Sequence, residues 1–191
     1  MRISALVGIA MLTLVLASGC KARGEWYEAS RESAGIAPNP VETSEAVLHV
    51  YGADAFGWYG MFAIHTWIAT KRRGDPYYTI YDVVGWRGYY GQGVLAIRQD
   101  LPDRHWYGAE PELLLEHRGE AAERLIEAVD AAARDYPWKH RYKAFPGPNS
   151  NTFTAWIGLQ VPELMLDLPL SAIGSGYASR AVEPDGAMPG G

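Results

Sequence analysis

Two segments of the chain carry side chains whose types and order could do chemistry together. His65 lies in the otherwise apolar run 64–68, and Ser150 lies in the polar run 147–154, at the predicted start of a helix. A hydroxyl at a helix start gains from the helix dipole and from free backbone amides that can hold an oxyanion. A histidine on a neighbouring strand can act as its base. The two segments therefore predict a Ser150–His65 pair for hydrolysis or acyl transfer at a peptide, amide or ester bond.

A serine nucleophile also needs an imidazole that is held in the correct orientation. The strand predicted after the one with His65 offers Asp82 for that role, and Tyr81, on the opposite face of the same strand, is the alternative. Asn149 is a natural helix cap, since its side-chain oxygen can accept from an amide one turn on. Asn149 or the backbone amides near Ser150 would stabilise the oxyanion.

The same residues also fit a structural interpretation. The polar run 149–152 can cap a helix and fix a turn, and His65 can be a core histidine with satisfied hydrogen bonds. The domain would then be non-catalytic and would use the same cleft to bind a ligand or a partner. Both hypotheses stay open on the sequence. The predicted cleft-lining side chains are mostly aromatic: Trp67, Trp86, Tyr89, Tyr90, Trp106 and Tyr107, with Asn151 beside them.

The other four histidines point less clearly to a site. His49 is predicted to be structural or at the sheet edge, His105 to rim the cleft, and His117 and His140 to lie on the surface. No pair has the i, i+4 spacing of zinc ligands on a helix, so no metal is predicted. The glycine-rich stretch 85–93 is followed by a strand rather than a helix, which argues against a phosphate loop, and no cofactor is predicted.

The periodicity of apolar residues predicts strands first and helices after them. The predicted strands cover residues 46–51, 61–70, 77–84 and 94–98, and the predicted helices cover residues 120–134 and about 149–161. The stretch 61–70 is apolar on both alternating faces, as expected of a central strand. The order indicates an α+β fold with a mostly antiparallel sheet.

The amino terminus has the three-part layout of a secretion signal. A positive residue is followed by an uncharged apolar run and then by small residues before Cys20. This layout, with Ala17 where Leu is commoner, resembles the lipobox of bacterial lipoproteins. It implies acylation of Cys20 with palmitate-type chains and the membrane as a partner. The alternative is ordinary secretion with an unmodified cysteine.

These features predict four regions along the chain: a signal peptide at 1–19, a lipid-anchored tether at 20–44, one globular domain at 45–178 and a disordered tail at 179–191. Lys21 rather than an aspartate follows the cysteine, which resembles the outer-membrane sorting pattern of enteric bacteria and favours the periplasmic face of the outer membrane. Peptidoglycan peptides, other envelope peptides and lipid acyl groups are the substrates accessible there.

Composition excludes several classes of protein. Cys20 is the only cysteine, so there is no internal disulfide and no second thiol for a nucleophile. The formal net charge is −5, and Lys and Arg are scattered along the chain, which argues against a nucleic-acid partner. The sequence predicts no oligomeric state.

Five motifs carry a resemblance to a known family, at residues 63–68, 85–87, 102–104, 112–115 and 146–153. They are similar to an uncharacterised bacterial family known as domain of unknown function 3750 (DUF3750), over about residues 47–177. The family name implies no activity.

More distantly, the layout resembles the circularly permuted papain-like folds, among them the permuted NlpC/P60 hydrolases, the lecithin-retinol acyltransferase-like (LRAT-like) enzymes and the small deSUMOylating peptidases. In those folds an early-strand histidine precedes a cysteine at a helix start. Here Ser150 stands where that cysteine would be.

Overall fold

The structure, a computed structural model, describes residues 26–181. The predicted signal peptide, Cys20 and most of the predicted tail lie outside the described residues. The domain contains a five-stranded antiparallel sheet with the strand order β4-β3-β2-β1-β5. Its strands are β1 (Val47–Asp54), β2 (Ile64–Lys71), β3 (Thr79–Val83), β4 (Leu95–Gln99) and β5 (Glu112–Arg118).

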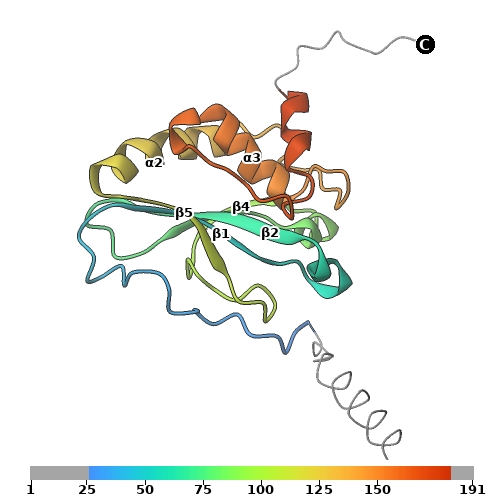
Figure 1. The fold of residues 1–191 in the computed structure, drawn as a ribbon, viewed down its shortest axis with the longest axis horizontal. Coiled ribbons are helices and arrows are strands. Elements are labelled where there is room, and N and C mark those ends of the chain that lie inside the picture. Colours follow the sequence, from blue (N-terminus) through green and yellow to red (C-terminus); the bar gives the residue numbers. More distant parts are fainter. Residues whose placement is uncertain (1–25, 182–191) are drawn as a thin grey trace, which may run out of the picture.

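The two α-helices cover one face of this sheet, and irregular segments cover the other (Figure 1). The helices are α2 (Gly119–Arg134) and α3 (Ser150–Gln160). Short 3₁₀ helices lie at η1 (Gly57–Met61), η2 (Gly85–Tyr90), η3 (Pro162–Leu164) and η4 (Ser175–Ala181). The fold class is therefore α+β with an antiparallel sheet, as predicted. No helix within residues 26–181 is long and apolar enough to cross a membrane.

Side-chain alternation along β2 divides the sheet into two faces. Ile68 belongs to the core under the helices, whereas Trp67 and Ala69 belong to a second apolar cluster on the face away from the helices. Successive side chains of a strand point to opposite faces, so His65 lies on the face of Trp67, and Thr66 lies on the helix face. This division decides which candidate residues can meet.

The predicted adjacency of the strands at 61–70 and 77–84 is correct, since β2 and β3 pair antiparallel and place Ile68 opposite Tyr81. Two details differ from the prediction. The strand begins at Ile64 rather than at residue 61, because the residues before it form η1. The sequence pattern also predicted no strand at β5, which pairs with β1 through a register shift at Val50/Tyr51. This edge strand is mostly exposed, with the remaining residues half-buried, and it lacks a strong alternating pattern.

The segment before β1 is attached to the domain, in contrast to the predicted tether. The Asp103 carboxylate accepts hydrogen bonds from the Ser33 hydroxyl at 2.8 Å and from the Ile36 and Ala37 amides at 2.8 and 3.0 Å. The Tyr78 hydroxyl donates to the Pro38 carbonyl. The buried carboxylate of Asp103 needs these donors, so this part of the chain is fixed against the sheet face that bears His65.

Candidate ligand-binding cavity

His65 and Asp82 meet on the face of the sheet away from the helices. The imidazole Nε2 lies 2.9 Å from Asp82 Oδ1, and the Asp82 carboxylate is almost fully buried. The Arg104 guanidinium donates to Asp82 Oδ2 at 3.2 Å, and Arg98 lies 3.9 Å away. Tyr81, the alternative partner, is on the helix face, where its hydroxyl donates to Asp130. Asp82 is thus the residue that orients His65.

The charge state of Asp82 follows from these neighbours. Burial by itself raises the pKa of this carboxyl, but the adjacent His65, Arg104 and Arg98 together hold its pKa below the ordinary value. An ionised carboxylate only accepts hydrogen bonds, so Nε2 of His65 is the donor in their contact. In the neutral imidazole the other nitrogen, Nδ1, then carries the lone pair and can accept a hydrogen bond.

Trp106 fixes the plane of the His65 ring. The two rings stack with their centroids 3.5 Å apart and an angle of 4° between their planes. Trp67, which was predicted to line a cleft, is instead buried beneath this pair and donates its Nε1–H to the Pro102 carbonyl. The contact to Asp82 and the stack on Trp106 hold the imidazole in a single orientation.

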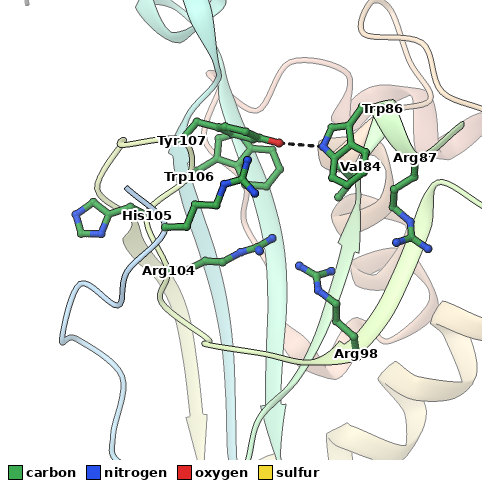
Figure 2. A pocket seen from close by; sticks show the side chains of 9 residues that line it. Val84, Trp86, Arg87, Arg98, Arg104, His105, Trp106 and Tyr107 are labelled. Carbon is green, nitrogen blue, oxygen red and sulfur yellow. Dashed lines mark hydrogen bonds between the residues drawn. The ribbon is translucent and has the colours of Figure 1, made fainter. Parts of the chain in front are cut away.

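A cavity of about 710 Å³ opens beside His65 at the ends of β2 and β3. Its walls are mainly aromatic, and Trp86, Trp106 and Tyr107 line it as the sequence suggested. Tyr89 and Tyr90 line it as well, as predicted, and further lining residues include Trp26, Arg31, Val84, His140 and Tyr142. Trp86 and Tyr107 come from different loops and are joined by a hydrogen bond of 2.9 Å from Trp86 Nε1 to the Tyr107 hydroxyl (Figure 2).

Gly85 shows how tightly one wall of the cavity is built. A Cβ atom at this position would lie 2.6 Å from ring carbons of Tyr142, so only glycine allows the ring to pack there. Burial also raises the pKa of the Tyr142 hydroxyl, and the nearby Asp82 carboxylate adds to this effect. Tyr142 therefore remains a neutral phenol at physiological pH.

A smaller chamber of about 180 Å³ adjoins the aromatic cavity. Arg98 and Arg104 extend into the space between the loops, with Tyr107 and Trp86 above them (Figure 2). Arg31 and Arg87 also line this chamber. None of these arginines, nor Tyr142 and His140, was a candidate on the sequence. Arg87 lies in the 85–87 family motif and Arg104 in the 102–104 family motif, and these motifs were the available signals.

Ser150 lies on the other side of the sheet from His65. It is the first residue of α3, and this helix packs against the face bearing Thr66, whose hydroxyl lies 3.0 Å from Asn151 Oδ1 and 2.9 Å from Thr154 Oγ1. Within residues 26–181 the Ser150 hydroxyl makes no hydrogen bond to His65. The predicted meeting of Ser150 and His65 across a cleft is therefore absent, because adjacent positions of β2 face opposite ways.

Asn149 and Asn151 have structural partners. The Asn149 side chain accepts from the Thr152 amide at 3.0 Å in a capping box, and its Nδ2 donates to the carbonyls of Ala144 and Ile173. Asn151 Nδ2 donates to the Ile64 and Ile173 carbonyls. Asn149 thus caps α3, as the structural interpretation expects, and its donors are occupied. Asn151 joins α3 to β2 and does not line the cavity.

The remaining histidines have separate environments. His49 is buried in β1, with Nδ1 2.7 Å from the Tyr51 hydroxyl and Nε2 2.9 Å from Glu116. His105 lines the arginine-rich chamber, and His117 is within 3.0 Å of the Leu164 carbonyl. Across the part of the chain that the structure describes, no three His, Cys, Asp or Glu side chains are grouped so that they could hold a metal ion.

Comparison with known proteins gives one match. Residues 45–177 match the family described as "Protein of unknown function (DUF3750)". No curated protein and no solved structure matches the chain, so the likeness to papain-like folds remains a prediction. The match spans the whole sheet, both α-helices and the cavity walls except the segment before residue 45, and the chain therefore belongs to the DUF3750 family.

Proposed function

We propose that this protein is a lipid-anchored protein of the bacterial cell envelope that binds a small organic ligand in the aromatic cavity beside His65. The observation that carries the proposal is the parallel stack of the His65 ring on the Trp106 ring, together with the contact between His65 Nε2 and the Asp82 carboxylate. A side chain fixed in this way presents one unused nitrogen in a constant position.

The size and lining of the cavity support binding of a small molecule. Ligand pockets commonly enclose about 300–1,000 Å³ and combine apolar or aromatic walls with a few fixed polar groups. The cavity of about 710 Å³ has this composition. Nε2 of His65 is occupied by Asp82, which leaves Nδ1 as the ring nitrogen for a ligand, so a ligand with an aromatic or apolar body and one polar group fits.

The position of Trp26 relates the cavity to the proposed anchor. Trp26 lines the cavity, and Cys20 precedes it by only six residues in the sequence. A chain of this length spans at most about 20 Å when fully extended. Lipidation of Cys20 would therefore hold the cavity close to the bilayer surface, where amphipathic ligands concentrate.

A fluorescent probe tests the cavity directly. N-phenyl-1-naphthylamine is uncharged, is aromatic and carries one N–H donor, so the mature protein is expected to bind it with one site and increased fluorescence. Trp106→Ala removes the ring that stacks on His65 and should weaken binding about tenfold, which corresponds to ~1.4 kcal/mol.

The matched control is Trp58→Ala, since Trp58 is 62% exposed on η1 and does not line the cavity. This variant should bind the probe like the wild type. Equal affinity of the wild type and Trp106→Ala, with both folded by near-UV circular dichroism, would refute the proposed site.

The second candidate function is a hydrolase or acyltransferase with His65 as its base, and the 2.9 Å contact between His65 and Asp82 favours it. That contact is the arrangement by which a carboxylate orients a catalytic imidazole. The reaction also needs a nucleophile within hydrogen-bond reach of Nδ1, directly or through one water. Ser150 would have to approach from the helix face of the sheet, and for this reason ligand binding is the function that the geometry supports better.

A further inference from the structure

We propose that the chamber lined by Arg31, Arg87, Arg98 and Arg104 holds an oxyanion, and that the ligand is consequently an organic anion with its body in the aromatic cavity. This inference rests on the proposed function and specifies the chemistry of the ligand. Carboxylate, phosphate and sulfonate groups each carry at least two anionic oxygens on one central atom, and guanidinium groups bind such oxygen pairs with paired hydrogen bonds.

The lining of the chamber is strongly positive. Four arginines line it, and no aspartate or glutamate does. Two carboxylates, Asp82 and Asp100, contact Arg98 and Arg104 from outside the chamber. Local charge thus remains positive by about two units, although the whole chain carries a formal net charge of −5. Distant acidic residues have little influence here, because physiological salt screens charges beyond about 8 Å.

The four guanidinium groups have two different roles. Asp100 Oδ2 accepts from Arg98 Nε and Arg104 Nη1, each at 3.1 Å, and this shared carboxylate fixes both arginines in place. Arg31 lies 4.6 Å above the Tyr107 ring, and Arg87 donates its Nε–H to the Gly93 carbonyl. Within residues 26–181, neither Arg31 nor Arg87 has an ion-pair partner, so their terminal N–H groups are available to a ligand.

The chamber and the aromatic cavity adjoin one another and share part of their walls. Five residues line both: Arg31, Val84, Trp86, Trp106 and Tyr107. A single molecule can therefore place its acidic group among the arginines while its apolar body lies against Trp106 and Trp86. A group that is only anionic, such as inorganic phosphate, would leave the larger cavity unfilled and bind more weakly.

Two probes that differ by one acidic group separate this inference from the proposed function. 1-Anilinonaphthalene-8-sulfonate has the ring system of N-phenyl-1-naphthylamine with a sulfonate added. With the mature protein, Arg31→Gln and Arg87→Gln should each weaken binding of the sulfonate about three- to tenfold. Each variant should change the affinity for the neutral probe less than about twofold, because that probe has no acidic group for the arginines to bind.

The control variant is Arg124→Gln, which removes the same charge from α2, where the Arg124 side chain is 73% exposed. It should leave both affinities unchanged. Using two arginine variants keeps the test valid if the loss of the Arg87–Gly93 contact prevents that variant from folding.

Three results would overturn the inference. The first is an affinity for the sulfonate probe that neither Arg31→Gln nor Arg87→Gln changes. The second is a loss of affinity in these variants that is equal for the charged and the neutral probe. The third is a loss of affinity in Arg124→Gln as large as in these variants. If the neutral probe still binds in a Trp106-dependent way, the cavity proposal stands and only the anionic character of the ligand is wrong. If neither probe binds, the proposed function fails, and the inference fails with it.

Discussion

Asp82→Asn is expected to lower the free energy of unfolding by about 3 kcal/mol at pH 7. The substitution keeps the size of the side chain but removes a buried negative charge that contacts His65, Arg104 and Arg98. Removing one partner of a buried ion pair leaves the others poorly compensated, which costs more than the pair itself contributes. Chemical denaturation followed by tryptophan fluorescence measures the change.

The pH dependence of this effect has a definite sign. The pKa of Asp82 is lower in the folded protein than its ordinary value of 3.8, so the folded state binds this proton less tightly than the unfolded state. Its contribution is therefore fully present above the unfolded pKa, and it is lost as the pH falls towards the folded pKa. The difference in the free energy of unfolding between wild type and Asp82→Asn should shrink as the pH falls below about 4.

The control for this prediction is Asp100→Asn. Asp100 contacts the same two arginines, but 29% of its side chain is exposed. Asp100→Asn should lower the free energy of unfolding by at most about 1 kcal/mol. If Asp82→Asn lowers the free energy of unfolding no more than Asp100→Asn does, the contacts of Asp82 with His65, Arg98 and Arg104 do not stabilise the fold as proposed.

Cys20→Ala is expected to abolish incorporation of an alkyne-labelled palmitate analogue by the full chain expressed in a bacterial host. Cys20 is the only cysteine, so no other thiol can form the thioether. The variant should also accumulate with its signal peptide uncleaved at this site. Gel fluorescence after labelling and fractionation of the envelope measure both effects.

The matched control is Lys21→Ala, which keeps the small residues and Cys20 and should be labelled like the wild type. Unchanged labelling of Cys20→Ala would refute the lipid anchor while leaving the cavity proposal intact. Fractionation of Lys21→Asp tests the predicted sorting to the outer membrane, since that prediction is based on Lys rather than Asp after the cysteine.

The sequence allowed prediction of those elements whose apolar pattern is strong. The double-sided apolar run around Ile68 indicated a central strand, and Leu125, Ile126 and Val129 recur at the spacing of a buried helix face. β5 was missed, because an edge strand that is half-exposed on both faces shows little periodicity. The attachment of residues 33–38 was missed because it depends on one buried carboxylate, Asp103, distant in the sequence.

In the candidate site, too, the contact between neighbouring strands was predicted correctly and the contact between distant segments was not. Asp82 was paired with His65 by reasoning along neighbouring strands, and the structure places these side chains in contact. Ser150 was paired with His65 by residue type and order, which do not specify the face of the sheet. Thr66 and His65 are adjacent in β2, so their side chains point to opposite faces of the sheet. Because Thr66 contacts α3, His65 lies on the face away from the helix that bears Ser150.

The arginine-rich chamber could not be predicted from spacing. Arg31, Arg87, Arg98 and Arg104 come from four separate segments, and each resembles an ordinary surface arginine in the sequence. Only the packing of the segment before β1 and the loop before β5 on one face of the sheet brings them together. The scattered basic residues that argue against a nucleic-acid partner therefore include a compact positive site.

A crystal structure of the mature protein with 1-anilinonaphthalene-8-sulfonate would show both where the ligand binds and what surrounds His65. We expect the aromatic rings of the probe against Trp106 and its sulfonate among the arginines, with Ser150 Oγ more than about 6 Å from His65 Nδ1. A probe bound elsewhere, with Ser150 Oγ hydrogen-bonded to His65 Nδ1, would contradict this expectation and favour the hydrolase.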